Sequence, residues 1–195
     1  MIRIIFVLVL SMACVQINFG QELQEGQLRW SEDHKLNLDD FKIKISTDQN
    51  EAVFSQFMIS HALSGFDFMK RNLNQKIDNI FLGKASWIDT TKVAHLQQQL
   101  EFQQLQFDLA EIQSRKFRKQ ILKDKGKIAK GFDIVNQINN EIMAQFSELR
   151  LELIQATDSG RDKEQLNIWK IKIANELANL DEYRFENKKP IKLNE

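Results

Sequence analysis

The pattern of apolar and polar positions changes once along the chain, near residue 90. Before that point, apolar residues come in short groups that are separated by polar turns and are rich in aromatic and branched side chains. Such groups predict the strands of a small sheet, with Gly65 and Gly83 as turn points. The expected strand groups are residues 28–30, 41–45, 53–63, 66–69 and 77–82.

After about residue 90, apolar residues recur three and four positions apart, which predicts long amphipathic helices. Gly126 and Gly131 are expected to separate the first two helices, and residues 158–160 the last two. Asp162 and Gln165 are spaced as a capping box for the third. Strands followed by helices predict an α+β fold, in which a small, mostly antiparallel sheet precedes about three long helices. The expected helices are residues 91–122, 132–153 and 166–180.

The first twenty residues have the layout of a secretory signal peptide. A positive start at Arg3 precedes an apolar run over residues 4–10, and small or polar residues follow as far as Gly20. The run is too short for a membrane span, which needs about 20 apolar residues. We therefore expect cleavage near Gly20 and a secreted or periplasmic protein without a stable membrane span. Lipoprotein anchoring through Cys14, the only cysteine, is a minor alternative.

Length, cysteine content and net charge limit the structural and functional classes to which the mature chain can belong. Residues 21–186 are long enough for one domain with its own core, and residues 187–195 are expected to form a loose tail. Removal of the signal peptide removes Cys14, so no disulfide can stabilise the mature chain. The whole chain has 27 basic and 27 acidic residues, and this neutrality argues against a generic nucleic-acid or membrane-surface binder.

The expected first helix carries a specific motif. Residues 101–112 read EFQQLQFDLAEI, and a basic run follows at residues 113–119. This segment resembles a helix of a bacterial secreted family of zinc-dependent proteases, whose pattern is His-Glu-Gln-x-His-Phe-Asp-x-Ala-Glu before a basic run. Similar positions elsewhere extend the resemblance over nearly the whole mature chain: Trp30 with residues 35–41, Ser86 with Trp87, and residues 156–160 with Gln165 and Trp169.

In a His-Glu-x-x-His helix, two imidazoles one turn apart hold zinc, and the glutamate takes a proton from the metal-bound water. The matching positions here are Phe102, Gln103 and Gln106. Phenylalanine cannot bind a metal, and glutamine is neither a general base nor a good zinc ligand. If the family's later histidine is the third ligand, Ser159 stands in its place. The resemblance thus implies a protease scaffold that has lost its zinc cofactor and its catalytic residues.

Asp108 and Glu111 remain from the motif and lie three residues apart on the helix. Either could belong to a residual site, together with His95, but a structural pair of Glu111 with Arg115 at helical spacing is favoured. The glutamines around the motif either line a polar groove that binds peptide or form a solvated face, which is the simpler interpretation. The basic stretch over residues 115–130 could attract an anionic partner, but a solvated helix end and loop is again the simpler interpretation.

Three hypotheses about function follow. The first is a non-catalytic, protease-like protein that binds a peptide or another protein of the cell envelope. The second is an active zinc-dependent or other hydrolase that uses unrelated residues or a rebuilt site. A rebuilt site with His61, His95 or Asp108 would need these side chains to converge in a pocket. The third is a structural interaction domain of the cell envelope, favoured if Phe102 packs against apolar neighbours in place of the metal.

Overall fold

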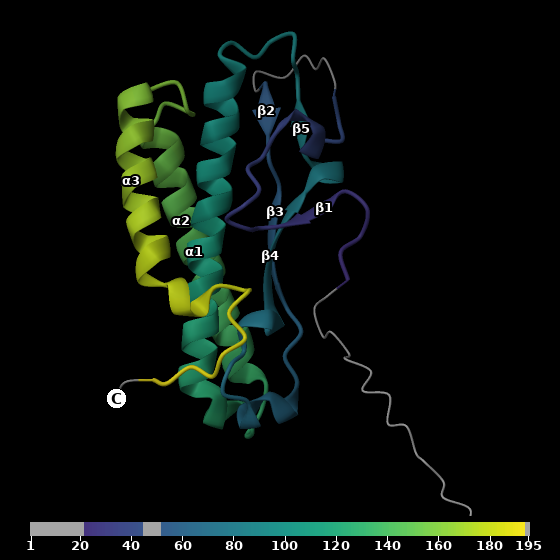
Figure 1. Ribbon diagram of the computed structural model, residues 1–195, viewed down its shortest axis with the longest axis vertical. Helices are drawn as coiled ribbons and strands as arrows, with labels where there is room; N and C mark the ends of the chain where they lie inside the picture. The colour runs from purple at the N-terminus through teal and green to yellow at the C-terminus, as the bar shows by residue number, and fades with distance from the viewer. Residues whose placement is uncertain (1–21, 45–51, 194–195) are drawn as a thin grey trace, which may run out of the picture.

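The computed structural model describes residues 22–44 and 52–193. The predicted signal peptide and its Cys14 lie outside the described residues. Short strands precede three long helices (Figure 1), which confirms the predicted α+β fold. The elements are β1 (Gln27–Arg29), β2 (Val53–Phe54), β3 (Phe57–His61), β4 (Ile77–Leu82), β5 (Trp87–Ile88), α1 (Leu96–Ile128), α2 (Asp133–Ala156) and α3 (Lys163–Asn179). No described helix is both long and apolar enough to cross a membrane.

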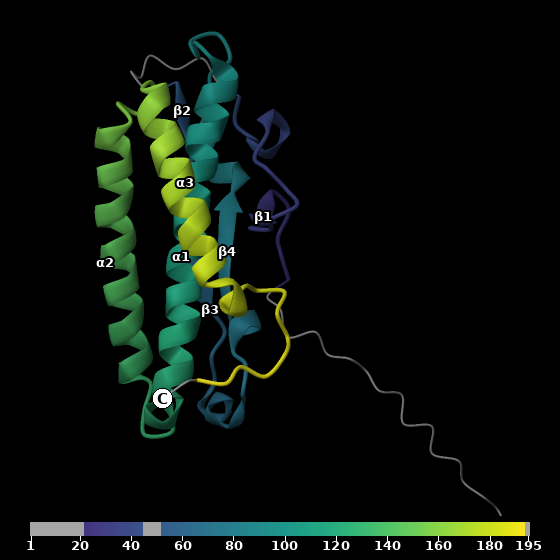
Figure 2. The same ribbon diagram turned by 60° about the vertical axis from the view of Figure 1, so that its left-hand side comes forward.

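The strands form two small antiparallel sheets. β4 lies between β1 and β3 in the larger one, and β2 pairs with β5 in the other. The sheets cover one side of α1, and α2 and α3 cover the opposite side (Figures 1 and 2). The helix α1 therefore runs through the centre of the molecule, between the strands and the other two helices.

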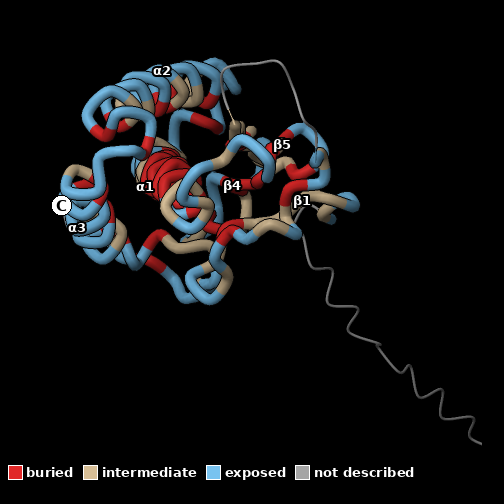
Figure 3. The backbone as a smooth tube through the Cα atoms, turned by 90° about the horizontal axis from the view of Figure 1, so that it is seen from above, coloured by how far each residue is buried: buried red, intermediate tan, exposed pale blue. Residues whose placement is uncertain are grey.

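Central placement leaves the middle of α1 without a solvated face. Every residue from 102 to 115 is buried, as the view from above shows (Figure 3). Several of these residues are polar, and buried polar groups need hydrogen-bond partners inside the protein. The expectation of a solvated glutamine face and a solvated basic run is therefore wrong for the buried side chains in these stretches, which are Gln103, Gln104, Gln106, Gln113, Arg115 and Arg118.

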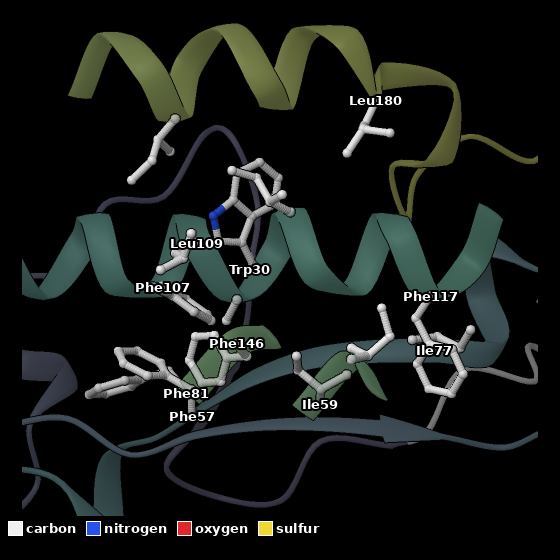
Figure 4. Packing of buried hydrophobic residues seen from close by; sticks show 14 of the residues in the cluster. Trp30, Phe57, Ile59, Ile77, Phe81, Phe107, Leu109, Phe117, Phe146 and Leu180 are labelled. Carbon is white, nitrogen blue, oxygen red and sulfur yellow. The ribbon is translucent and has the colours of Figure 1, made fainter. Parts of the chain in front are cut away.

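Aromatic side chains join α1 to the larger sheet. Phe107 of α1 stacks on Phe57 of β3 with ring centroids 5.3 Å apart, and Phe57 lies 5.9 Å from Phe81 of β4 (Figure 4). Trp30 and Trp169 are also buried, as expected for residues that anchor the core. Burial of such large side chains is the main force that holds the sheet and helices together.

Two predicted strand groups are wrong. Residues 66–69 lie in the 3-10 helix η2 (Gly65–Met69), because the Asp67 carboxylate accepts hydrogen bonds from the backbone N–H of Ser64 at 2.6 Å and its hydroxyl at 3.1 Å, which closes a helical turn. Of the group 41–45, residues 41–44 are described, and among these Ile43 alone forms an isolated bridge, to Trp87. The predicted group 53–63 is divided between β2 and β3, which belong to different sheets.

The helix boundaries differ from the prediction mainly in α1, which begins five residues later and ends six residues later than expected. Gly126 lies inside α1, since a glycine in a helix costs only about 1 kcal/mol and long-range packing can override it. The turn to α2 falls at Gly131, whose φ is +154°. Asp162 caps α3 by accepting from the backbone N–H of Gln165 at 3.0 Å, which is one half of the predicted capping box.

The described part of the C-terminal segment is not loose, contrary to prediction. The backbone N–H of Ile191 donates to the Arg71 carbonyl oxygen at 2.9 Å. The amide of Asn72 donates to the carbonyl oxygens of Asn187 at 2.8 Å and Lys189 at 2.6 Å. The Ile191 side chain is buried. Hydrogen bonds and burial therefore hold this segment against the loop that precedes β4.

Candidate binding groove

The four positions that match the zinc motif lie together. Phe102, Gln103, Gln106 and Ser159 all line one groove of about 610 Å³. The first half of α1 forms its floor, while residues of β2 and α2 form its walls. The other lining residues are Ala52, Val53, Phe54, Ser55, Lys92, Val93, Ala94, Gln99, Ser147, Arg150, Leu151, Ile154 and Arg161.

Phe102 packs against the turn between α2 and α3. A Cβ atom added to Gly160 would lie 2.6 Å from Cβ and Cγ of Phe102, and Gly160 has a φ of +82°. Both the close approach and the positive φ require glycine at this position. Phe102 is 5% exposed, so its ring fills space beside the groove where the resemblance would place an imidazole.

Gln103 and Gln106 are held by a hydrogen-bonded network. The Gln106 amide donates from Nε2 to Oε1 of Gln103 at 3.0 Å. Arg150 of α2 donates from Nε to Oε1 of Gln106 at 2.7 Å and from Nη2 to the Ser55 carbonyl oxygen at 3.0 Å. This network joins the floor of the groove to both walls, and it supplies the partners that the two buried amides require.

The lining of the groove is positively charged. Three of its residues, Lys92, Arg150 and Arg161, are basic, and the described lining contains no acidic residue. Asp89 lies 3.9 Å from the Lys92 ammonium, and Asp158 pairs with Arg161 at 2.6 Å, but neither carboxylate lines the groove. A ligand in the groove would meet cations, amides and hydroxyl groups together with apolar side chains.

The residues present do not fit zinc. Oε1 of Gln103 already accepts from Gln106, and Oε1 of Gln106 already accepts from Arg150. The groove offers no histidine, cysteine or carboxylate among the described residues. Elsewhere in residues 22–44 and 52–193 there is also no group of three or more such side chains that could hold a metal ion.

Asp108 faces away from the groove. Its Oδ1 accepts hydrogen bonds from Nε1 of Trp30 and from Nε2 of Gln104, each at 2.7 Å. It lines a separate pocket of about 270 Å³ between α1, α3 and the segment around Trp30, and Arg115 lines the same pocket. Burial raises the pKa of the Asp108 carboxyl. The structure therefore separates Asp108 from the four altered motif positions.

Glu111 forms the predicted pair with Arg115, whose Nε donates at 3.0 Å. It also accepts from Nη1 of Arg118 at 2.7 Å, and all three side chains are buried. The two guanidinium groups also donate to backbone oxygens: Arg115 donates to Leu177, and Arg118 donates to Ile77 and Tyr183. This cluster connects α1 to β4, to α3 and to the 3-10 helix η5 (Asp181–Tyr183), which is a structural role.

The histidines do not converge with Asp108. His95 is exposed and occupies the N-cap of α1 with a φ of 58°, thirteen residues or about 20 Å of helix from Asp108. His61 of β3 lies edge-on against Phe117 at 6.0 Å, and burial lowers its pKa. Neither His61 nor His95 lines either of the two pockets described above. The geometry therefore does not bring His61, His95 and Asp108 together in one pocket.

Sequence reasoning did not identify Arg150 and Ser55 as parts of the site. Arg150 follows Phe146 by four residues, so it lies on the helix face that the apolar pattern assigned to the core. A lone arginine on a buried face is a signal of a specific polar partner. Ser55 offered no comparable signal, because its carbonyl oxygen, rather than its side chain, accepts the bond from Arg150.

Comparison of the chain with protein-family profiles, with characterised proteins and with solved structures found no match.

Proposed function

We propose that the protein is a non-catalytic, protease-like protein of the cell exterior or periplasm, whose groove binds a peptide segment of a partner. One observation carries this proposal: Phe102, Gln103, Gln106 and Ser159 line the same groove. The first three are neighbours on α1, whereas Ser159 lies far from them in the sequence. Their convergence is what a shared ancestral site predicts. The side chains at these positions support binding without zinc chemistry.

The groove has the features that peptide recognition needs. Its wall β2 pairs with β5 on one side, and an extended peptide could add to the other edge through backbone hydrogen bonds. The cations and amides would bind carbonyl or carboxylate oxygens of the peptide, while Phe54, Leu151 and Ile154 offer apolar contacts. Gln103 and Gln106 are fixed by their network, so little side-chain entropy is lost on binding.

A display library of linear peptides, selected on the purified protein, would test binding. The groove variant Ser147→Trp fills the groove from α2, and Glu148→Trp is its matched control, since Glu148 is exposed and does not line the groove. Selected peptides are expected to bind the Ser147→Trp variant at least about tenfold more weakly than the control. Equal binding to both variants, or no enriched peptide, would contradict the proposal, as would peptide cleavage detected by mass spectrometry.

The ancestry of the groove can be tested by rebuilding the motif. The variant Phe102→His, Gln103→Glu, Gln106→His, Ser159→His is expected to bind one zinc ion per chain, because it restores helical ligand spacing and a third ligand. A helical pair on the exposed face of α2, Gln137→His with Glu141→His, lacks the third ligand and serves as control. Tight zinc binding by the wild-type protein would contradict the proposal. Weak binding by the rebuilt site, no better than the control, would remove the support from ancestry.

A structural domain of the cell envelope is the second candidate. It is favoured by the burial of Phe102, whose ring packs on the Gly160 turn and belongs to the hydrophobic core. In that case the groove is a by-product of packing, and the Ser147→Trp variant would leave every interaction of the protein unchanged.

A further inference from the structure

One end of the molecule exposes large apolar side chains. In the 3-10 helix η2, Phe66 is 75% exposed, Met69 65% and Phe68 37%, and Phe132 at the start of α2 is 37% exposed. Both segments lie at the end of the molecule where α1 finishes, at the bottom of Figure 1. These four residues, named the apolar tip here, are more than half of the seven large apolar side chains exposed in the described structure. Such clustering marks an interaction site.

The segments that carry the apolar tip are strongly basic. Residues 64–76 contain three basic residues and one acidic, and residues 119–133 contain five basic and two acidic, so the local balance is eight against three. Two of the three acids are already paired, Asp67 with Lys70 at 2.7 Å and Asp124 with Lys127 at 2.7 Å. The chain is neutral as a whole, so its positive charge is concentrated at this end.

The C-terminal segment adds to this charge. Residues 187–193 contain three lysines and no acidic residue, and this segment is bonded to Arg71 and Asn72, which directly follow η2. The apolar tip is therefore flanked by cations directly after η2, on the end of α1 and on the C-terminal segment.

The apolar tip is held in place by specific bonds. Asp67 accepts from the backbone of Ser64 and pairs with Lys70, which closes the turn on which Phe66 and Met69 stand. The Lys125 ammonium of α1 donates to the Lys70 carbonyl oxygen at 3.0 Å, which ties the turn to the helix. The turn therefore holds its apolar side chains in solvent without folding them back onto the core.

We propose that the apolar tip binds the surface of a membrane that contains anionic lipids. Phenylalanine and methionine side chains would enter the interface between head groups and acyl chains, and the surrounding lysines would lie against the lipid phosphates. The tip projects from the end of the fold, and neither described pocket includes any of its residues. A projecting apolar turn with flanking cations fits a soft, negatively charged surface better than it fits the concave site of a protein partner.

This arrangement has a consequence for the groove. Groove residues on α1 lie between Gln99 and Gln106, near its first turns, whereas the apolar tip lies beside its last turns. The helix has 33 residues, which corresponds to about 50 Å. A molecule bound through the tip would hold its groove away from the membrane surface.

Sedimentation with vesicles tests the proposal. The purified protein is mixed with vesicles of phosphatidylcholine alone or with about one third phosphatidylglycerol. We expect binding to the anionic vesicles only, weakened by added salt. The double variant Phe66→Ser, Met69→Ser is expected to bind at least about tenfold more weakly, and Lys123→Gln with Lys130→Gln to lose part of the binding. The control Ile168→Ser, Ile171→Ser removes exposed apolar side chains of α3 and is expected to bind normally.

All substituted residues are exposed, and unchanged circular dichroism would show that each variant is folded. The proposal is overturned if the wild-type protein stays in the supernatant with anionic vesicles, or if the Phe66→Ser, Met69→Ser variant binds as well as the control. It is also overturned if light scattering shows a dimer that these two substitutions dissociate while vesicles bind neither form, since the tip would then be an interface between copies of the chain.

Discussion

Nε of Arg150 on α2 lies 2.7 Å from Oε1 of Gln106 on α1, and Nη2 of the same guanidinium lies 3.0 Å from the carbonyl oxygen of Ser55. One side chain thus bridges the two walls of the groove across its floor. The bond also gives the oxygen of the buried Gln106 amide a donor in a place where water has little access.

Arg150→Met is expected to destabilise the protein by about 1–3 kcal/mol, because it removes two charge-assisted hydrogen bonds and leaves Oε1 of Gln106 without its donor. Urea denaturation measures the change. Arg161→Met is the matched control at the rim of the groove, where the arginine pairs with an exposed Asp158, and it is expected to change stability little. Equal losses in the two variants would show that the bridge has no special role.

Gly160→Ala is expected to destabilise the protein by about 2 kcal/mol or more, because the new Cβ would collide with Phe102 and the backbone has a positive φ. Gly126→Ala is expected to have the opposite effect, a gain of about 0.5–1 kcal/mol, since Gly126 is inside a helix and has open space around it. Thermal unfolding of both variants tests the pair. A Gly160→Ala variant as stable as the wild type would refute the close contact with Phe102.

Glu111→Gln is expected to cost about 3–5 kcal/mol, because it leaves two buried guanidinium groups without their shared carboxylate. The comparison is Glu176→Gln, which removes a partly exposed pair with Lys116 and is expected to cost less than about 1 kcal/mol. Chemical denaturation of both variants at neutral pH measures the difference. A small loss for Glu111→Gln would mean that water reaches the cluster.

The buried carboxyl of Asp108 makes the stability of the folded protein depend on pH, and the direction of this dependence follows from its raised pKa. Burial raises the pKa of its carboxyl above the ordinary value of 3.8, so the folded protein holds a proton that the unfolded chain releases. The corresponding stability is fully present below the ordinary pKa and is lost as the pH rises through the raised one. Asp108→Asn removes this loss, and Oδ1 of the new side chain can still accept from Trp30 and Gln104. The stability of the variant relative to the wild type is therefore expected to increase with pH over this window.

Asp124→Asn is the control of opposite sign in the same denaturation series. A hydrogen bond from Lys127 lowers the pKa of Asp124, so its contribution to stability is present above the ordinary pKa and is lost as the pH falls through the lowered one. The stability of this variant relative to the wild type is expected to increase as the pH falls. If the difference in stability between Asp108→Asn and the wild type does not change between about pH 4 and about pH 8, burial does not raise the pKa of Asp108 as proposed.

The parts of the fold that were predictable are those set by local periodicity. Repeats of apolar residues identified three helices, and short apolar groups identified most strands, because each pattern reflects which face of an element is buried. The environment of α1 was not predictable in this way. A helix covered on both sides buries its polar residues as well. Gln104 and Arg118 therefore look solvated in sequence, although Gln104 accepts from the backbone N–H of Leu36 and Arg118 donates to the carbonyl oxygen of Ile77.

The sequence predicted where the candidate site lies, but not which side chains form its hydrogen bonds. The motif resemblance selected Phe102, Gln106 and Ser159, and the structure places them on one groove. It could not indicate Arg150, whose role depends on how α2 crosses α1. The resemblance also grouped Asp108 with the motif. Gln106 lies two positions before Asp108, and side chains two positions apart on a helix point in different directions. The basic stretch over residues 115–130 was visible in the sequence, but its position beside the basic segments around η2 and at the C-terminus depends on the tertiary structure.

The bonds made by Arg118 bring together parts of the chain that are distant in sequence. Its guanidinium donates to Ile77 in β4, to Glu111 in its own helix and to the carbonyl oxygen of Tyr183, which lies 106 residues after Ile77. Contacts between segments this far apart form only after a long loop has closed, and that closure costs chain entropy. The Arg118 cluster therefore belongs to the contacts that slow the folding of this domain.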